Sequence, residues 1–174
     1  LKTMLPDYAK DTKLNLSTVL TEEGAPELTL SQILGIALAS ACASKNKLLI
    51  SVMTEICKNQ LSELEIQAAK AASVIMAMNN VYYRFIHLAN NKHFSSMPAR
   101  LRMNVLASHG IDKISFELFS LAVSAINGCG MCIEAHTAAL TNAGLSDMAI
   151  QSCIRIASVL QSTAMALELV DAEK

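Results

Sequence analysis

Tryptophan is absent from this chain of 174 residues, and four phenylalanines and three tyrosines supply all of its aromatic side chains. Glycine and proline are also scarce, with six and three residues, although 52% of the chain is hydrophobic. β-Sheets favour aromatic and β-branched residues, and all-β folds need many turns rich in glycine and proline. A core of Ala, Leu, Ile, Val and Met suits closely packed helices better. We therefore predict an all-α fold, and the length corresponds to one domain, residues 1–174, with its own core.

The chain also lacks an excess of either charge, because its formal net charge is −1 and no run of Lys or Arg exceeds two residues. This argues against nucleic acid as a partner. No uninterrupted apolar run reaches the ~18 residues that a membrane span needs, and the first residues lack the pattern of a signal peptide. We expect a cytoplasmic protein, in which a cysteine pair is catalytic or metal-binding more often than structural.

Apolar periodicity and capping signals predict a series of helices joined by short breaks, with no stretch that alternates with period two. Residues 1–28 contain polar turns, and residues 90–98 form a polar connector. The expected helices cover residues 30–42, 46–58, 62–88, 113–126, 129–142 and 146–170, with a short one at 99–107.

Segments of the chain that lie about 84 residues apart resemble each other. Leu61–Gln67 and Leu145–Gln151 share four of seven residues, and Ala72–Ile75 resembles Ala157–Leu160. We interpret this as one three-helix unit used twice, over roughly 30–88 and 114–170. Chance similarity between two amphipathic helices that begin with serine is the alternative.

The second copy carries a motif that the first lacks, Cys129-Gly130-Met131-Cys132. Asn127 and Gly128 tolerate the left-handed conformation that ends a helix, so Cys129 should stand at the start of the next one. Free backbone N–H groups and the positive end of the helix dipole lower the pKa of a thiol there. Residues three apart face each other across one turn, and the pair can therefore form a disulfide reversibly.

His136 follows Cys132 by four residues and Cys129 by seven, which places the three side chains on one stripe of a helix. A histidine beside a thiol can accept its proton or stabilise the thiolate. Glu117 lies inside an apolar helical stretch, where a carboxylate needs a partner, and a contact with His136 would extend the proton chain. The corresponding positions of the first copy hold no such groups: Lys45 for Cys129, Leu48 for Cys132, Val52 for His136 and Ile33 for Glu117.

Each element of this site has a plainer interpretation. The cysteines and His136 supply three zinc ligands, and Glu117 or His109 would have to supply the fourth. His136 alone would be an ordinary core histidine, and Glu117 alone a surface residue near the start of its helix. Cys42, Cys57 and Cys153 stand singly in apolar contexts, as buried small side chains do, and the nine methionines suit the core.

The stretch from Phe116 to His136 resembles the active-site region of the alkylhydroperoxidase D (AhpD) family, in the carboxymuconolactone decarboxylase-like superfamily. That family has a Glu, eleven residues, a Cys-x-x-Cys pair, three residues and a His, a pattern that fits Glu117, Cys129, Cys132 and His136 without a gap. The resemblance extends to residues 79–85 and 101–105 and so covers most of the chain.

The resemblance implies an all-α AhpD-like fold built from two similar helical repeats and assembled as a homotrimer. It also implies a thiol-dependent peroxidase with no bound cofactor or metal. Cys132 would attack the organic hydroperoxide and become a sulfenic acid, Cys129 would close the disulfide, and Glu117 and His136 would relay protons. The reductant would be dihydrolipoamide on a lipoylated acyltransferase subunit, recharged by lipoamide dehydrogenase. An AhpC-type peroxiredoxin would be a further partner.

Two points stay open on the residues alone. The start of the helix favours Cys129 as the nucleophile, whereas the distance to His136 favours Cys132, the choice that the resemblance implies. Some members of the family have a proton-transferring histidine where this chain has Met131, which cannot transfer protons. The alternatives to a peroxidase are therefore a general dithiol–disulfide oxidoreductase and, by analogy with the superfamily alone, a cofactor-free lactone decarboxylase.

Overall fold

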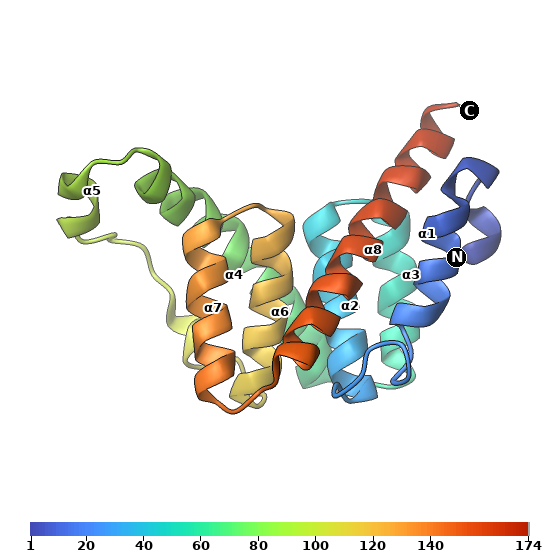
Figure 1. Ribbon diagram of the computed structural model, residues 1–174, viewed down its shortest axis with the longest axis horizontal. Coiled ribbons are helices and arrows are strands. Elements are labelled where there is room, and N and C mark those ends of the chain that lie inside the picture. The colour runs from blue at the N-terminus through green and yellow to red at the C-terminus, as the bar shows by residue number, and fades with distance from the viewer. Residues whose placement is uncertain (174) are drawn as a thin grey trace.

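The computed structural model describes residues 1–173, which form eight α-helices and three short 3-10 turns without any strand in that range (Figure 1). This confirms the all-α prediction. The helices are α1 (Lys10–Val19), α2 (Leu30–Ser44), α3 (Lys47–Lys58), α4 (Glu63–Leu88), α5 (Lys92–Ser96), α6 (Lys113–Ile126), α7 (Gly130–Asn142) and α8 (Asp147–Ala172).

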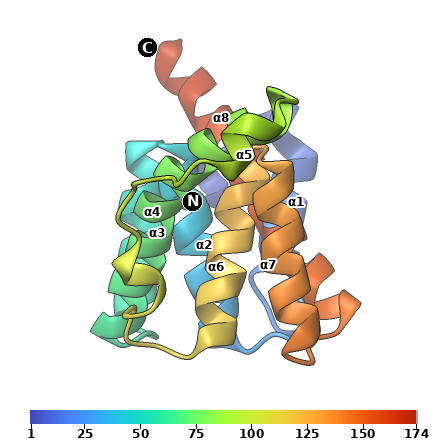
Figure 2. The ribbon, with the colours of Figure 1, turned by 90° about the vertical axis from the view of Figure 1, so that its left-hand side faces the viewer.

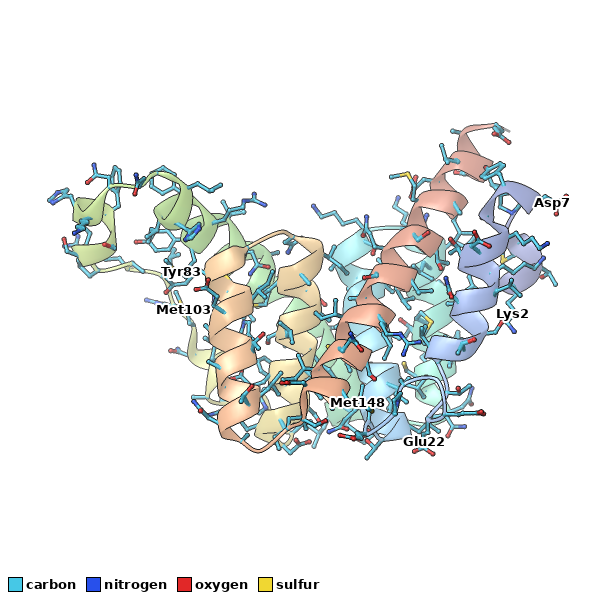
Figure 3. All side chains as sticks on the ribbon, in the orientation of Figure 1. Lys2, Asp7, Glu22, Tyr83, Met103 and Met148 are labelled. Atoms are coloured by element: carbon cyan, nitrogen blue, oxygen red, sulfur yellow. A yellow bond between two sulfur atoms is a disulfide. The ribbon has the colours of Figure 1, made fainter. Side chains whose placement is uncertain are left out.

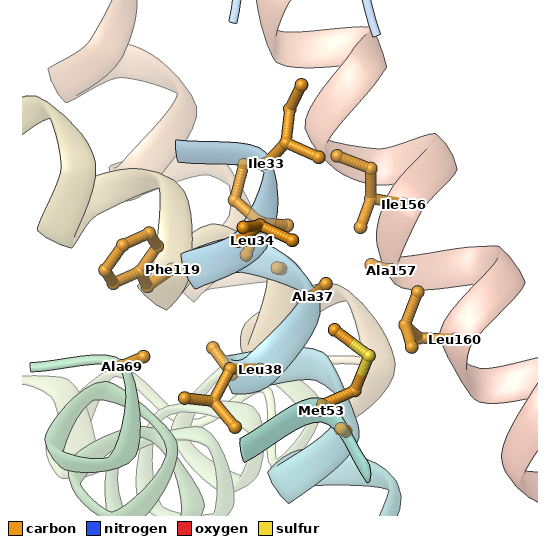
Figure 4. Packing of buried hydrophobic residues seen from close by; sticks show 14 of the residues in the cluster. Ile33, Leu34, Ala37, Leu38, Met53, Ala69, Phe119, Ile156, Ala157 and Leu160 are labelled. Carbon is orange, nitrogen blue, oxygen red and sulfur yellow. The ribbon is translucent and has the colours of Figure 1, made fainter. Parts of the chain in front are cut away.

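Helix α2 is the centre of the core. It packs against α3, α4, α6 and α8, and nine consecutive residues, Ile33–Ala41, are buried (Figure 4). Gly35 lets α6 approach closely, because a Cβ added there would lie 2.2 Å from Cζ of Phe119. A helix with apolar residues on every side belongs in the interior, and this explains the run of small and aliphatic residues in α2.

Side-chain caps set the starts of the main helices. Thr29 with Gln32 and Ser62 with Glu65 form complete capping boxes, each with the Gln or Glu three residues after the cap. Hydrogen bonds from the Ser31 and Ser62 side chains and the Ser62 backbone hold the pKa of Glu65 below its usual value. These contacts also tie the start of α4 to α2, because Ser31 belongs to α2.

The connecting segments differ from the expectations at three places. The turns expected within residues 1–28 lie at 20–27, and residues 10–19 before them form the helix α1, which was not predicted, because Leu16 and Val19 bury against the bundle. Asn91 caps a one-turn helix, α5, inside the predicted connector. The helix expected at 99–107 is only a 3-10 turn at Asn104–Leu106, and Arg100 before it has a positive φ of 53° that no helix accommodates.

The helices α2, α3 and α4 have 15, 12 and 26 residues, and α6, α7 and α8 have 14, 13 and 26. Helix α6 packs between α4 and α7 (Figure 2). The matching lengths are compatible with a duplicated unit, which remains a proposal.

Helix α8 is long and apolar enough to cross a membrane by length and composition. Its apolar residues nevertheless bury against α1, α2 and α6 within the bundle, where Ile156, Ala157 and Leu160 are almost fully enclosed (Figure 4). The core helix of a globular protein has the same properties.

Candidate active site

The turn between α6 and α7 places Cys129 at the start of α7, as predicted. Gly128 adopts a positive φ of 67°, whereas Asn127 stays in the ordinary right-handed region. The backbone N–H of Cys129 donates to the carbonyl of Ser124 at 3.1 Å. Cys129 is the N-cap of α7, and its Sγ accepts from the N–H of Cys132 at 3.3 Å. A sulfur in this position lies against the positive end of the helix.

Cys129 and Cys132 are joined by a disulfide, with their Cα atoms 5.3 Å apart. The two sulfurs differ in access, because Cys129 is fully buried whereas Cys132 is 6% exposed. Cys132 borders a cavity of about 230 Å³, and Cys129 does not line it. A small molecule that enters the cavity therefore meets Cys132 first.

This cavity lies between α4, α7 and the segment that leads to α6. Its walls are mainly apolar and come from Met76, Tyr83, Leu106, Met131 and Ala135. Tyr83 and Met103 lie side by side where this segment passes α4 (Figure 3), and the Tyr83 hydroxyl is 4.0 Å from the Met103 sulfur. The few polar groups among the lining residues are those of Asn79 and His136, together with the hydroxyl of Tyr83. Such a site favours a ligand with one polar end and an apolar body.

His136 lines the same cavity as Cys132 and pairs with Glu117, as the residue spacing suggests. Nδ1 of His136 lies 2.7 Å from Oε2 of Glu117, and the two side chains are 15% and 22% exposed. Nε2 of His136 lies 3.3 Å from the sulfur of Met76. Within residues 1–173, no hydrogen bond joins His136 directly to either cysteine sulfur. A proton passing between them needs a molecule in the cavity to bridge the gap.

A hydrogen-bonded network that residue spacing alone did not reveal holds the turn before Cys129. The Arg84 guanidinium donates to the Asn127 carbonyl at 2.5 Å, and the Asn127 amide donates to Oδ1 of Asn80 at 2.9 Å. Asn80, which is buried, donates in turn to Oγ of Ser124 at 2.9 Å. The signal in the sequence is a pair of asparagines, Asn79 and Asn80, in a helix whose buried face is apolar apart from these two residues and Ser73.

The three remaining cysteines are free thiols, and Cys57 and Cys153 are fully buried. Burial raises the pKa of Cys57 to about 12 and also raises the pKa of Cys153. Cys42 is partly buried, and burial raises its pKa as well. All three are therefore neutral thiols at neutral pH, and a neutral thiol is a poor nucleophile.

Alkylation should consequently distinguish the two groups of cysteines. We expect iodoacetamide at pH 7.5 to modify the oxidised protein slowly, since the disulfide blocks the active pair and the other thiols are protonated. After reduction, fast labelling should appear at Cys132, as mass mapping of peptides will show. The denatured protein, in which every thiol reacts, is the control. Fast labelling of Cys153 in the folded protein would contradict this assignment.

The alternative zinc site finds no support in the geometry. Among residues 1–173, no group of three His, Cys, Asp or Glu side chains lies close enough to hold a metal ion. His109, the candidate fourth ligand, stacks its ring on Phe116 with centroids 4.2 Å apart.

Known proteins resemble this chain over almost its whole length. The model of the carboxymuconolactone decarboxylase family matches residues 93–172, which include Glu117, Cys129, Cys132 and His136. A Coxiella burnetii (strain Dugway 5J108-111) protein named alkyl hydroperoxide reductase AhpD is 55% identical over 163 residues, covering 94% of this chain and 92% of the relative. Proteins of the same name from Brucella abortus (strain 2308) and Rhodopseudomonas palustris (strain BisB18) are 52% and 51% identical, covering 99% and 97% of this chain and 97% and 91% of their own lengths. The chain therefore belongs to the AhpD group of the carboxymuconolactone decarboxylase family.

Proposed function

We propose that this protein is an alkyl hydroperoxide reductase that works through a dithiol–disulfide cycle of Cys129 and Cys132. The observation that carries the proposal is the difference between the two sulfurs. Cys132 opens into an apolar cavity that His136 shares, and Cys129 is enclosed behind it. This supports Cys132 as the sulfur that meets the hydroperoxide and Cys129 as the one that resolves the product. The names of the relatives support the same activity.

The first step is attack by the Cys132 thiolate on the terminal oxygen of the hydroperoxide. An S–O bond forms and the O–O bond breaks, which leaves a sulfenic acid on Cys132 and an alkoxide that takes a proton to become the alcohol. The pair His136–Glu117 borders the site. It can accept the thiol proton before attack and return a proton to the leaving oxygen, as general acid–base catalysis requires.

The second step is attack by Cys129 on the sulfenic sulfur, which releases water and forms the disulfide. The positions of the two residues support this step, because the Cα atoms are 5.3 Å apart on one helical turn. The helix start stabilises Cys129 as a thiolate. Two electrons have then passed from the dithiol to the hydroperoxide, and an external dithiol must return them.

We propose a dihydrolipoamide group, carried by a lipoylated acyltransferase subunit, as that reductant. The disulfide is accessible only at Cys132, which is 6% exposed inside a cavity of about 230 Å³. A slender dithiol arm can reach a sulfur in such a cavity more readily than a thiol on the surface of a folded protein. Exchange would form a mixed disulfide with Cys132, then free both cysteines and release the cyclic lipoamide disulfide. When no hydroperoxide binds, the reduced pair Cys129 and Cys132 would instead pass its electrons to an AhpC-type peroxiredoxin, the further proposed partner.

The test is consumption of cumene hydroperoxide by the purified protein with dihydrolipoamide as the electron donor. We expect turnover well above the rate of dihydrolipoamide and hydroperoxide without protein, and a much lower rate with glutathione, a monothiol. Equal rates with and without the protein would overturn the peroxidase proposal. Equal rates with both thiols would overturn the proposed reductant alone.

A general dithiol–disulfide oxidoreductase is the second candidate, and Met131 is the observation that favours it. Met131 contributes an apolar wall at the position where some relatives have a proton-transferring histidine. Rapid exchange with dihydrolipoamide, combined with oxidation by hydroperoxide no faster than that of a free dithiol, would identify this function.

We also propose that the chain assembles as a homotrimer in the cytoplasm, where a supply of reduced dithiol sustains the cycle. Exposed apolar side chains support the assembly, since α5 and the end of α4 project from the bundle (Figure 1). These side chains are Val81, Phe85, Leu88, Phe94, Met97 and Leu101. Apolar patches of this kind mark interaction surfaces. Analytical ultracentrifugation should give three times the mass of the chain.

A further inference from the structure

Another cavity lies where α4 passes the C-terminal ends of α2 and α6. Its volume is about 390 Å³, and it shares no lining residue with the cavity beside Cys132. The charged residues that line it are Lys45 and Arg84, and it has no Asp or Glu among its lining residues. A cavity lined by cations without a carboxylate attracts anions.

Arg84 leaves most of its hydrogen-bonding capacity unused. Its side chain is partly buried, and Nη1 donates to the Asn127 carbonyl at 2.5 Å. A guanidinium has five N–H donors. In the part of the chain that the structure describes, the Arg84 side chain makes no other hydrogen bond and no ion pair with a carboxylate. A partly buried guanidinium loses hydration, so an oxyanion that supplies the missing acceptors is favoured there.

Lys45 supplies a second cation without an anionic partner. It follows the last residue of α2 in the left-handed conformation, with a φ of 62°. A lysine near the end of a helix can hydrogen-bond the last carbonyls, but the Lys45 ammonium bonds no group among the described residues. The ammonium of Lys70 also acts electrostatically on the thiol of Cys42, which lines the cavity. Three positive charges therefore lie at or near this cavity.

We propose that this cavity is a binding site for a small organic carboxylate with an apolar body. Arg84 holds the carboxylate through parallel N–H donors, the geometry in which a guanidinium matches a carboxylate, and Lys45 adds the attraction of its charge. The volume of about 390 Å³ has room for roughly a dozen water-sized atoms. The apolar body packs against the apolar lining residues Ala43, Ala77, Val81 and Ile126. This proposal goes beyond the proposed peroxidase function and does not depend on it.

The cavity also reaches the turn before Cys129. Asn80, Arg84 and Asn127 line it, and the hydrogen bonds among these three residues hold that turn. A carboxylate on Arg84 therefore contacts the network behind Cys129 without entering the cavity that Cys132 borders. The carboxylate is thus a ligand separate from the hydroperoxide, and the two can be bound at the same time.

The experiment titrates the disulfide form of the whole chain with benzoate, a carboxylate on an apolar ring, and follows binding by NMR. Benzamide has the same shape without the charge, and inorganic phosphate has charge without an apolar body. We expect benzoate to bind about tenfold or more tightly than either, because hydrogen bonds to a charged group are stronger than neutral ones. Arg84→Met keeps the apolar stem of the side chain and should weaken benzoate binding by a similar factor.

Two further variants complete the design. Lys45→Gly removes the ammonium, and glycine accepts the φ of 62° without strain, so the variant should fold normally and bind benzoate more weakly. Lys47→Met is the matched control, because it removes an equal charge that lines a different cavity, and its affinity for benzoate should not change. If Arg84→Met does not fold without its bond to Asn127, Lys45→Gly decides.

Cys42 provides an independent readout of the same cavity. In the disulfide form it is a partly buried free thiol, whereas Cys57 and Cys153 are fully buried. Labelling by iodoacetamide at about pH 9, just above the ordinary pKa of a thiol, should therefore occur first at Cys42. Saturating benzoate should slow this labelling severalfold, because the ligand fills the cavity that Cys42 lines. Benzamide at the same concentration should not slow it.

Three results would each overturn the inference. They are equal affinities for benzoate and benzamide, an unchanged affinity for benzoate in Arg84→Met (or in Lys45→Gly, should the first variant not fold), and labelling of Cys42 that benzoate does not slow. None of these measurements uses a hydroperoxide. A protein that binds benzoate as expected but does not reduce hydroperoxides would therefore reject the proposed function alone, and the opposite pair of results would reject the carboxylate site alone.

Discussion

Replacing Cys132 with serine should lower hydroperoxide turnover at least ~1,000-fold, since the loss of a nucleophile removes the covalent step that the other groups assist. A serine hydroxyl remains protonated at neutral pH and does not reduce peroxides. Cys132 is the sulfur that borders the cavity, and Cys129 is fully buried. The variant should therefore show no burst of oxidation when the reduced protein is mixed with cumene hydroperoxide in a stopped-flow instrument.

Cys129→Ser is the matched control, because it removes a sulfur from the same motif but leaves the one that borders the cavity. It should consume about one equivalent of hydroperoxide per chain and then stop, since the sulfenic acid on Cys132 has no thiol nearby to resolve it. A sulfenic-acid reagent such as dimedone should label Cys132 in this variant, as mass spectrometry will show. The reverse pattern, with a burst in Cys132→Ser and none in Cys129→Ser, would exchange the two roles. That result would show that the stabilisation of the Cys129 thiolate at the start of the helix decides which cysteine attacks the hydroperoxide, and not the opening of Cys132 into the cavity.

The difference between the two sulfurs illustrates what the sequence could predict and what it could not. Spacing along one helix places Cys129, Cys132 and His136 on the same stripe, and the end of a helix at Gly128 places Cys129 at the next helix start. Both are local properties: the structure places Cys129 at the N-cap of α7 after Gly128 with positive φ, and Cys132 and His136 line one cavity. Which sulfur faces a cavity depends on what packs against the helix, here α4 and the segment around Leu106. No local pattern encodes that arrangement.

The same reasoning explains which parts of the fold were missed. The long helices have a strong apolar period and clear caps, and no predicted bound differs from the observed one by more than two residues. Helix α1 has polar residues along most of its length, and two buried residues, Leu16 and Val19, are enough to hold it against the bundle. Tertiary contacts decide short helices of this kind more than propensity does.

The proposed duplication gains a further argument from the cavities. If the two copies correspond at an offset of 84 residues, Lys45 and Leu48 take the places of Cys129 and Cys132. They line a separate cavity of about 530 Å³ with Leu167 and Glu168 on α8. At the offset of 85 that relates Ala72–Ile75 to Ala157–Leu160, those two residues correspond to Tyr82 and Tyr83 on α4. The two copies would then have hollows in equivalent places, and only the second would hold a dithiol.

The second large effect concerns the pair His136–Glu117. We expect Glu117→Gln to slow oxidation of the reduced protein by about 100-fold at neutral pH, at the lower end of what general acid–base catalysis contributes. Glutamine keeps a hydrogen-bonding group 2.7 Å from Nδ1 of His136 but loses the negative charge that stabilises a protonated imidazole. His136→Asn should have a similar effect. Among the described residues, His136 is the only hydrogen-bond partner of the Glu117 carboxylate, so Glu117 can act on the Cys132 sulfur only through His136.

Two readouts separate a proton relay from a merely structural pair. The double variant should be no slower than the slower single variant, because residues that act as one unit have effects that do not add. The loss in Glu117→Gln should also shrink as the pH rises past about 8.5, the ordinary pKa of a thiol, since hydroxide then supplies the thiolate without the relay. A loss that is constant across this pH range, together with additive effects, would reject the relay. Since Nε2 of His136 faces the Met76 sulfur and not a cysteine, the proton must travel through a molecule in the cavity. A hydroperoxide bound in the cavity beside Cys132 would be well placed to receive it as its O–O bond breaks.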